Sequence, residues 1–149
     1  MHDRLDHGQR LKLAATATVL AVAVAAAWFA QWMTDPDAYR VEIVVDNETV
    51  GAFNLDSMKA LPQREVSMQG QIQEGPSVLS LLEVAGIKQF DRLVISGMGE
   101  RDDGRIVLTS HEVNEDVLLD FAARGTVKIC GPNVEWADRV RDVQRIEVR

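Results

Sequence analysis

The 149-residue sequence predicts an α+β domain, rich in short strands with a few short helices, that follows one membrane-spanning helix. Three observations support this fold class: an uncharged apolar run near the amino terminus, alternating apolar and polar residues in later segments, and turn residues between those segments. We expect four parts, namely an amino-terminal segment 1–12, a membrane helix 13–33, a linker 34–38 and a domain 39–149.

The apolar run from Leu13 to Ala30 contains no charged residue. Together with Gln31–Met33 it would span roughly 30 Å as a helix, which is enough to cross a bilayer core. Membrane lipid is therefore an expected partner of this segment. A removable signal peptide cleaved near Ala25–Ala27 is the alternative, but Trp28 and Trp32 suit a membrane interface and favour a retained anchor.

The charges beside the apolar run predict its orientation. Basic residues precede it, and acidic residues follow it: Arg4, Arg10 and Lys12, then Asp35 and Asp37. Because basic residues favour the cytoplasmic side, we expect a single-pass membrane protein with a cytoplasmic amino terminus and an extracytoplasmic domain.

The first half of the domain is predicted to be mostly extended. Tyr39–Asp46 alternates between apolar and polar residues, which is typical of a half-buried strand, and Val50–Leu55 predicts a second strand. Asp56 is expected to cap a short helix that Pro62 ends. Arg64–Gly70 then reads as extended again.

The next segments predict a core helix and a strand pair. In Pro76–Gly86 the apolar residues recur at helical spacing, with Pro76 in the first turn and Gly86 at the end. Asp91–Gly97 and Arg105–Thr109 flank a turn and should pair as neighbouring strands.

The last part of the chain combines a predicted helix with two strands. Asn114 could cap a short helix that extends to Gly125 and places Asp120 and Arg124 one turn apart. Thr126–Cys130 and Asp142–Val148 read as strands.

Charge and histidine content exclude several function classes. From Thr34 to Arg149 there are 13 basic and 21 acidic residues, so the domain carries a net charge of −8 and should not bind nucleic acid. His111 is the only histidine in this region, whereas a zinc site needs three or four protein ligands. The sequence therefore predicts neither a metal site nor catalytic residues.

Three further features have an ordinary structural interpretation beside a functional one. Cys130, the only cysteine, is expected to pack in the core, with an intermolecular disulfide as the alternative. The charged stretch Gly99–Arg105 is expected to be a solvated hairpin tip, although Arg101 and Arg105 could bind a protein partner. Trp136 is expected to be buried rather than to stack on a ligand.

The order of these pieces resembles the sulfite oxidase-like molybdopterin-binding domain. The resemblance covers Tyr39–Val148 and depends on five segments: Gly51–Gln71, Gly75–Ile87, Asp91–Gly97, Val117–Gly125 and Asp138–Val148. It implies a mixed, β-rich fold with short helices. In that family a cysteine thiolate at the end of the strand before the central helix ligates molybdenum.

This chain departs from the family at the ligand position. Met68, Gln69, Gly70 and Gln71 occupy the stretch where the cysteine is expected, and neutral amide or thioether groups are poor replacements for a thiolate. The passage after Gly125 is also shortened, which leaves few cations for a pterin phosphate. We therefore expect no bound molybdenum cofactor, with molybdopterin as the alternative.

These points predict a membrane-anchored, extracytoplasmic binding or accessory module that pairs with another membrane or exported protein subunit. A minimal molybdopterin-dependent oxidoreductase subunit is one alternative, and a small-ligand sensor domain is another. The candidate ligand-binding residues are polar or basic side chains in the region that the resemblance assigns to the cofactor: Gln69, Gln71, Arg105 and Lys128.

Overall fold

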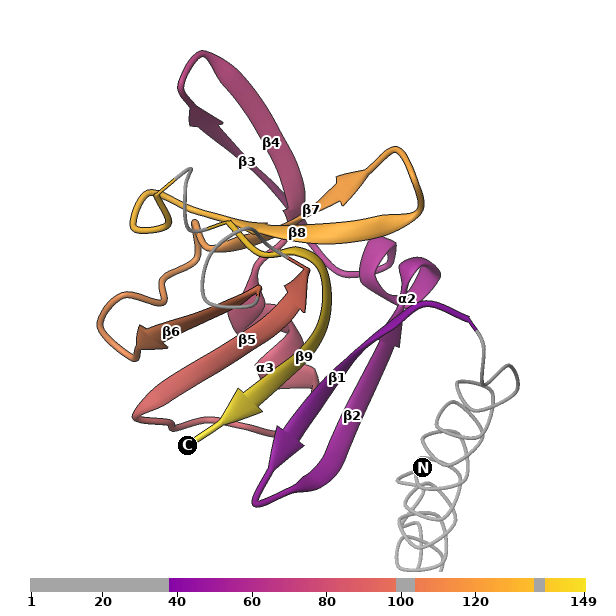
Figure 1. The fold of residues 1–149 in the computed structure, drawn as a ribbon, viewed down its shortest axis with the longest axis vertical. Helices are drawn as coiled ribbons and strands as arrows, with labels where there is room; N and C mark the ends of the chain where they lie inside the picture. Colours follow the sequence, from indigo (N-terminus) through magenta and orange to yellow (C-terminus); the bar gives the residue numbers. More distant parts are fainter. Residues whose placement is uncertain (1–37, 99–103, 136–138) are drawn as a thin grey trace, which may run out of the picture. The chain divides into compact units, whose positions relative to one another are not determined.

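A five-stranded sheet is the largest element of the computed structural model, which describes residues 38–98, 104–135 and 139–149 (Figure 1). Its strand order is β2-β1-β9-β5-β6, in which β1 and β9 are parallel and the other neighbours are antiparallel. The strands are β1 (Arg40–Val45), β2 (Glu48–Asn54), β5 (Arg92–Met98), β6 (Arg105–Thr109) and β9 (Arg141–Val148).

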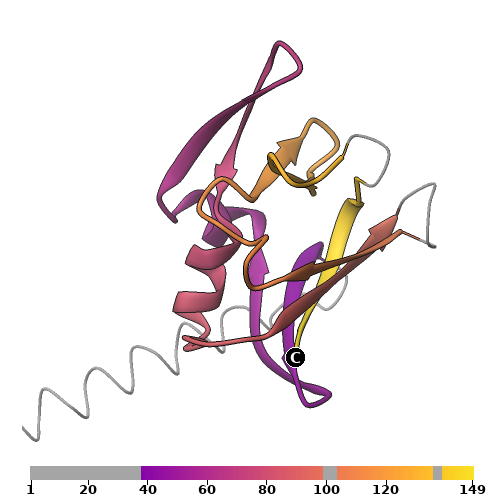
Figure 2. The same cartoon turned by 90° about the vertical axis from the view of Figure 1, so that its left-hand side faces the viewer.

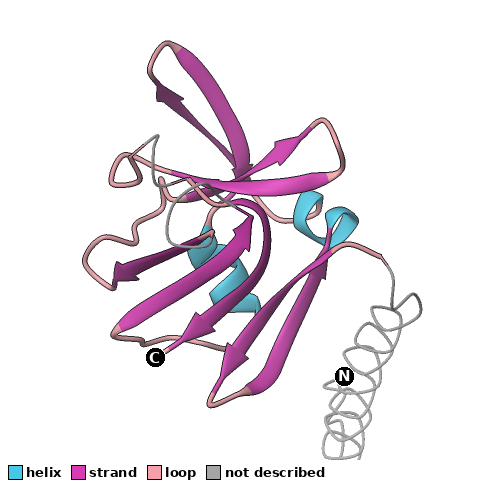
Figure 3. Cartoon of the chain, in the orientation of Figure 1, coloured by secondary structure: helices cyan, strands magenta, loops and turns pink. Residues whose placement is uncertain are grey.

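Two antiparallel hairpins lie at one end of this sheet (Figures 1 and 3). The first consists of β3 (Gln63–Met68) and β4 (Gln71–Pro76) and projects away from the rest of the domain. The second consists of β7 (Leu118–Ala122) and β8 (Thr126–Cys130) and lies between the first hairpin and the five-stranded sheet.

Two short helices complete the described part of the chain. Helix α2 (Leu55–Lys59) begins after Asn54, whose side chain accepts a hydrogen bond from the Ser57 backbone N–H. Helix α3 (Val78–Val84) is capped in the same way by Ser77 and packs against one face of the large sheet (Figure 2). Side-chain oxygens at both caps satisfy N–H groups that a first helical turn leaves without partners.

The core lies between α3 and the inner face of the large sheet. Ile43, Ile146 and Ile95 are register partners on adjacent strands and are fully buried. Burying each such side chain contributes roughly 1.5–3 kcal/mol to folding. The alternate residues on the same strands, including Arg145 and Glu147, form a charged outer face, as period-two patterning requires.

A close backbone contact joins the two hairpins. A Cβ atom at Gly75 in β4 would lie 2.0 Å from the Leu119 carbonyl oxygen in β7. One residue away, the Glu74 backbone N–H donates to Asp120 Oδ1 at 3.1 Å. Only glycine allows this approach, so Gly75 fixes how the projecting hairpin sits on β7–β8.

Several predicted elements are confirmed, and others are wrong. The strands at β1, β2, β3, β5, β6, β8 and β9 and the helix at α3 occur where the patterns indicate, and β5 pairs with β6. The expected helix from Asn114 to Gly125 is instead strand β7 and a turn. Pro76 ends strand β4 rather than beginning α3, and Asn54 rather than Asp56 caps α2.

The proposed membrane helix 13–33 lies outside the described residues. Within the described ranges, none of the helices has the length and hydropathy needed to cross a bilayer.

We predict that Gly75→Ala destabilises the domain strongly, because the new methyl group would push β4 away from β7. The expected loss in the free energy of unfolding is roughly 3 kcal/mol. Ser67→Ala, an exposed change in the same hairpin, should alter stability by less than about 0.5 kcal/mol. Urea unfolding followed by circular dichroism measures both values, and equal stabilities of the two variants would contradict the close contact.

Candidate functional site

A partly buried ion pair lies on the β7–β8 hairpin. The strand register places Asp120 directly opposite Lys128, and Asp120 Oδ2 lies 2.9 Å from Lys128 Nζ. The Asp120 side chain is only 13% exposed and that of Lys128 26%, so water screens this pair less than a surface pair. Since Asp120 also accepts the Glu74 N–H, one carboxylate connects β4, β7 and β8.

The Cys130 thiol forms a cluster with Asp120 and Lys128, and it is unreactive. It is fully buried, and Sγ lies 3.8 Å from the Leu118 carbonyl oxygen. Burial, and then the charge of Asp120, raise the pKa of Cys130 to about 11, although Arg139 and Lys128 act in the opposite direction. The thiol therefore stays protonated at neutral pH and is a poor nucleophile and metal ligand.

A shallow pocket of about 320 Å³ lies beside this cluster, between the β7–β8 turn and the start of β9. Its walls combine small and charged residues: Ala122, Ala123, Arg124, Lys128, Arg141 and Asp142. Asp142 Oδ1 lies 2.7 Å from Arg124 Nε and also accepts a hydrogen bond from Thr126 Oγ1. Three cations and one carboxylate therefore line this opening.

An irregularity at the start of β9 shapes the pocket wall. The β5–β9 register shifts between Ser96 and Met98, and Asp142 adopts a left-handed backbone conformation with φ 48°. The Arg141 and Asp142 carbonyl oxygens come so close to Gly97 that a Cβ there would lie 2.6 Å from each. A bulge of this kind re-aims side chains, and here it directs Arg141 to the pocket.

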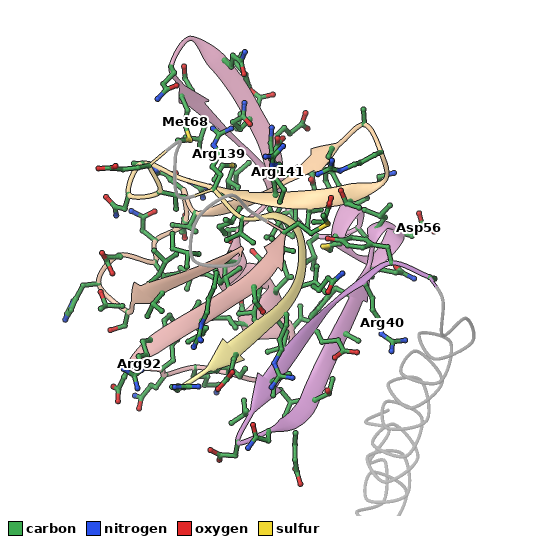
Figure 4. The ribbon with its side chains drawn as sticks, viewed as in Figure 1. Arg40, Asp56, Met68, Arg92, Arg139 and Arg141 are labelled. Carbon is green, nitrogen blue, oxygen red and sulfur yellow. The ribbon has the colours of Figure 1, made fainter. Side chains whose placement is uncertain are left out.

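Basic side chains gather on this side of the domain. In the view of Figure 4, Arg139 and Arg141 both lie above β8, toward the β3–β4 hairpin. The main chain between them is held to β8, because the Ile129 N–H donates to the Val140 carbonyl oxygen at 3.0 Å. Burial lowers the pKa of Arg139, while Cys130 and Asp120 act in the opposite direction, so Arg139 belongs to the electrostatic surroundings of the cluster.

The four predicted ligand-binding residues lie on three separate elements. Gln69 and Gln71 are exposed at the tip of the β3–β4 hairpin, where Gln69 has φ 50° in the turn. Arg105 is exposed on edge strand β6, and Lys128 is half-buried on β8. Of the four, only Lys128 lines the pocket. His111 is exposed in a loop, whereas Arg101 and Trp136 lie outside the described residues.

The buried glutamine of the hairpin is Gln73, which the sequence patterns did not single out. Its side chain is 3% exposed, and its Nε2 donates to the Ile72 carbonyl oxygen at 3.3 Å. Among the described residues, Gln73 Oε1 has no hydrogen-bond partner. A buried acceptor in this condition commonly binds an ordered water.

The described residues do not supply the donor set that the family resemblance implies. Cys130 lies on β8 rather than on the β3–β4 hairpin, and burial keeps its thiol protonated. The hairpin offers neutral amides at Gln69, Gln71 and Gln73, which do not donate thiolate charge to a metal. In addition, the described ranges contain no group of three or more His, Cys, Asp or Glu residues suited to a metal ion.

The fold and the site together define a β-rich domain with short helices and a basic pocket. The chain is similar to the crystal structure of the sulfane dehydrogenase SoxCD from Paracoccus pantotrophus, with a TM-score of 0.56 and 18% sequence identity. The similarity covers 74% of this chain and 38% of that chain, so this chain corresponds to less than half of its neighbour. No protein-family model and no curated protein matches the sequence.

At 18% identity the similarity to SoxCD concerns the fold alone. The β-rich architecture with short helices is nevertheless compatible with the sulfite oxidase-like domain expected from the order of segments.

We predict that the stability of the domain falls as pH rises from about 9 to 11. The unfolded thiol of Cys130 loses its proton near its ordinary pKa of 9.0, whereas the folded thiol keeps it until about 11. The folded state then binds more protons in this range, so its advantage is present below pH 9 and is lost above it. Tyr39, whose pKa burial raises from 10.0 to about 12, extends the decline to higher pH.

Cys130→Ala tests whether the Cys130 thiol causes the loss of stability at high pH. The variant should lose about 1 kcal/mol of stability at neutral pH through the cavity it leaves. Its stability should then decline less between pH 9 and 10 than that of the wild type, as measured by urea unfolding at each pH. An unchanged slope would show that Cys130 does not cause the decline.

Proposed function

We propose that the domain is a non-catalytic binding module that uses a sulfite oxidase-like fold without molybdenum cofactor. The observation that carries this proposal is the state of the thiol: the only cysteine of the chain is buried on β8, and its pKa is raised to about 11. The hairpin tip, where the resemblance places the ligand, presents the neutral side chains of Gln69 and Gln71.

The basic pocket supports a binding role. Arg124, Lys128 and Arg141 meet at an opening on a domain that is otherwise strongly acidic. Guanidinium and ammonium groups that meet at one opening offer N–H donors of the kind that hydrogen-bond an anionic group. No activated nucleophile or acid–base pair accompanies them in the described part of the pocket wall, so binding without chemistry is the simpler use.

A minimal oxidoreductase subunit is the second candidate, and the structural similarity to a sulfane dehydrogenase favours it. In that case a partner chain would supply the missing metal ligand and the walls of the cofactor site. The similarity carries no more than the fold, whereas the buried thiol is a property of this chain, so we favour the binding module.

Molybdenum and pterin content test this proposal. The full chain, purified in detergent from cells that make molybdopterin, should contain far less than one molybdenum atom and one pterin per chain. Elemental analysis and the fluorescence of oxidised pterin measure the two, and a molybdoenzyme purified from the same cells is the positive control. Near-stoichiometric molybdenum together with pterin would favour the oxidoreductase.

We further propose that residues 13–33 anchor the domain outside the cytoplasm, next to a membrane or exported partner subunit. The support is the uncharged apolar run and the basic residues that precede it. A retained anchor predicts that the mature protein keeps its amino terminus, which intact mass spectrometry measures.

A reporter enzyme that is active only outside the cytoplasm, fused after Arg149, should be active because basic residues hold the preceding segment inside. Replacing Arg4, Arg10 and Lys12 with glutamine should lower that activity by weakening the orientation signal. A well-expressed but inactive wild-type fusion would reverse the topology.

A further inference from the structure

We infer that the open edge of strand β3 binds an extended, basic segment of a partner protein, which adds a third strand to the β3–β4 hairpin. Within the described residues β3 pairs only with β4, and β4 lies between β3 and the β7–β8 hairpin (Figure 2). The free side of β3 is therefore the outer edge of the ribbon. This edge is separate from the basic pocket, so the inference goes beyond the proposed function and applies to either candidate function.

The turn of the hairpin determines which backbone groups of β3 face the open edge. Gln69 and Gly70 form a two-residue turn with φ 50° and 77°, as in a type I′ hairpin. The residues on either side of such a turn form a hydrogen-bonded pair, and hydrogen-bonded and open pairs then alternate along the ladder. The N–H and C=O groups of Glu65 and Ser67 therefore point away from β4.

The same alternation accounts for a contact on the other side of the hairpin. Glu74 is the register partner of Glu65, and its N–H points away from β3 and donates to Asp120 Oδ1 at 3.1 Å. Among the described residues, no backbone hydrogen bond reaches the outward groups of Glu65 and Ser67, and both residues are exposed. A row of such groups is a template for pairing with another chain.

The ribbon is held at its base and open toward its tip. At the base, Gly75 allows the close approach to Leu119, and Arg64 forms an ion pair with Glu115. Ile72, near the tip, is 70% exposed. A two-stranded ribbon is only marginally stable in water, and a third strand stabilises it. Because β3 is already extended, less conformational entropy is lost when that strand is added.

The charges on the exposed face of the ribbon favour a basic occupant. Glu65 and Glu74 lie directly opposite each other, and Ser67 and Ile72 form the next pair on the same face. Like charges in this position destabilise a strand pair. The ion pairs of the described residues include neither carboxylate. A lysine or arginine beside Glu65 would offset the repulsion, and an apolar residue two positions along would lie over the small Ser67 toward Ile72.

The same charges disfavour a second copy of this chain as the occupant. Antiparallel pairing of two β3 edges would bring Glu65 and Glu74 of both copies onto one face. The region from Thr34 to Arg149, with 13 basic and 21 acidic residues, would add to the repulsion. A basic segment of another protein is complementary to this face, and its backbone supplies partners for the open edge.

Binding of synthetic peptides to the detergent-solubilised full chain, followed by fluorescence anisotropy, tests the inference. The basic probe is a labelled peptide with alternating lysine and valine on one face and threonine on the other. The acidic probe has glutamate in place of each lysine, and a third probe is the basic peptide methylated on its backbone nitrogens. We expect the basic probe to bind, and the other two to bind at least roughly tenfold more weakly.

Substitutions in the hairpin locate the binding edge. Glu65→Gln should weaken binding of the basic probe roughly two- to fivefold, as expected for an exposed ion pair. Ser67→Pro removes an outward N–H while it leaves the bonds to β4 in place, and it should weaken binding more. Glu48→Gln, an exposed glutamate on edge strand β2, is the matched control and should leave binding unchanged. Circular dichroism checks that each variant keeps its fold.

Two kinds of result would overturn the inference. The first is equal binding of the basic, acidic and methylated probes, or an equal loss of binding in Glu65→Gln and Glu48→Gln; neither comparison depends on the folding of Ser67→Pro. The second is a dimer in sedimentation that Ser67→Pro converts to a monomer, because a second copy would then occupy the edge. Neither result would decide the proposed function, since the molybdenum and pterin content is measured independently.

Discussion

The arrangement of the β3–β4 and β7–β8 hairpins depends on the contacts of the Asp120 carboxylate. One oxygen accepts the Glu74 N–H and the other pairs with Lys128, so the same side chain attaches the projecting β3–β4 hairpin and orients a wall of the pocket. The glycine contact between β4 and β7 makes this geometry possible, since a larger residue at position 75 would separate the strands. Packing and electrostatics are thus coupled at one residue.

The same carboxylate makes the cluster unsuited to thiolate chemistry. A negative charge near the buried Cys130 opposes formation of a thiolate, while it holds the neighbouring ammonium group of Lys128 in place. A catalytic cysteine needs the opposite arrangement, in which cations dominate and water has access. The domain therefore combines a β-rich fold similar to that of SoxCD with a buried sulfur that stays protonated at neutral pH.

The sequence predicted the strands whose apolar residues alternate, because one face of each packs on the core and the other meets water. It failed at β7, since Leu118 and Leu119 are both buried, and a short run buried on both faces fits a helix equally well. It also failed at β4, where Gln71, Ile72 and Glu74 are exposed on a projecting ribbon and show no apolar alternation.

The candidate site was predictable only in part. Lys128 was identified because it is the one cation in the shortened passage after Gly125, where the family resemblance implies contacts to a pterin phosphate. The packing of β8 against β9 and the irregular start of β9 bring together Arg124, Arg141 and Asp142. Neither the packing nor the irregularity has a local signature in the sequence. The interpretation of Asp120 and Arg124 as a helical pair was wrong, because on a strand Asp120 faces its cross-strand partner Lys128.

The position of β9 in the sheet determines the order in which the domain can form. This strand follows the other strands of the described residues, yet it lies between β1 and β5 and supplies a pairing edge to each. While the polypeptide emerges from the ribosome or crosses a membrane, β1–β2 and β5–β6 can form only as separate ribbons with open edges. The central sheet closes once Arg141–Val148 is available, so this chain depends on late, long-range pairing and leaves strand edges with unpaired backbone groups until it occurs.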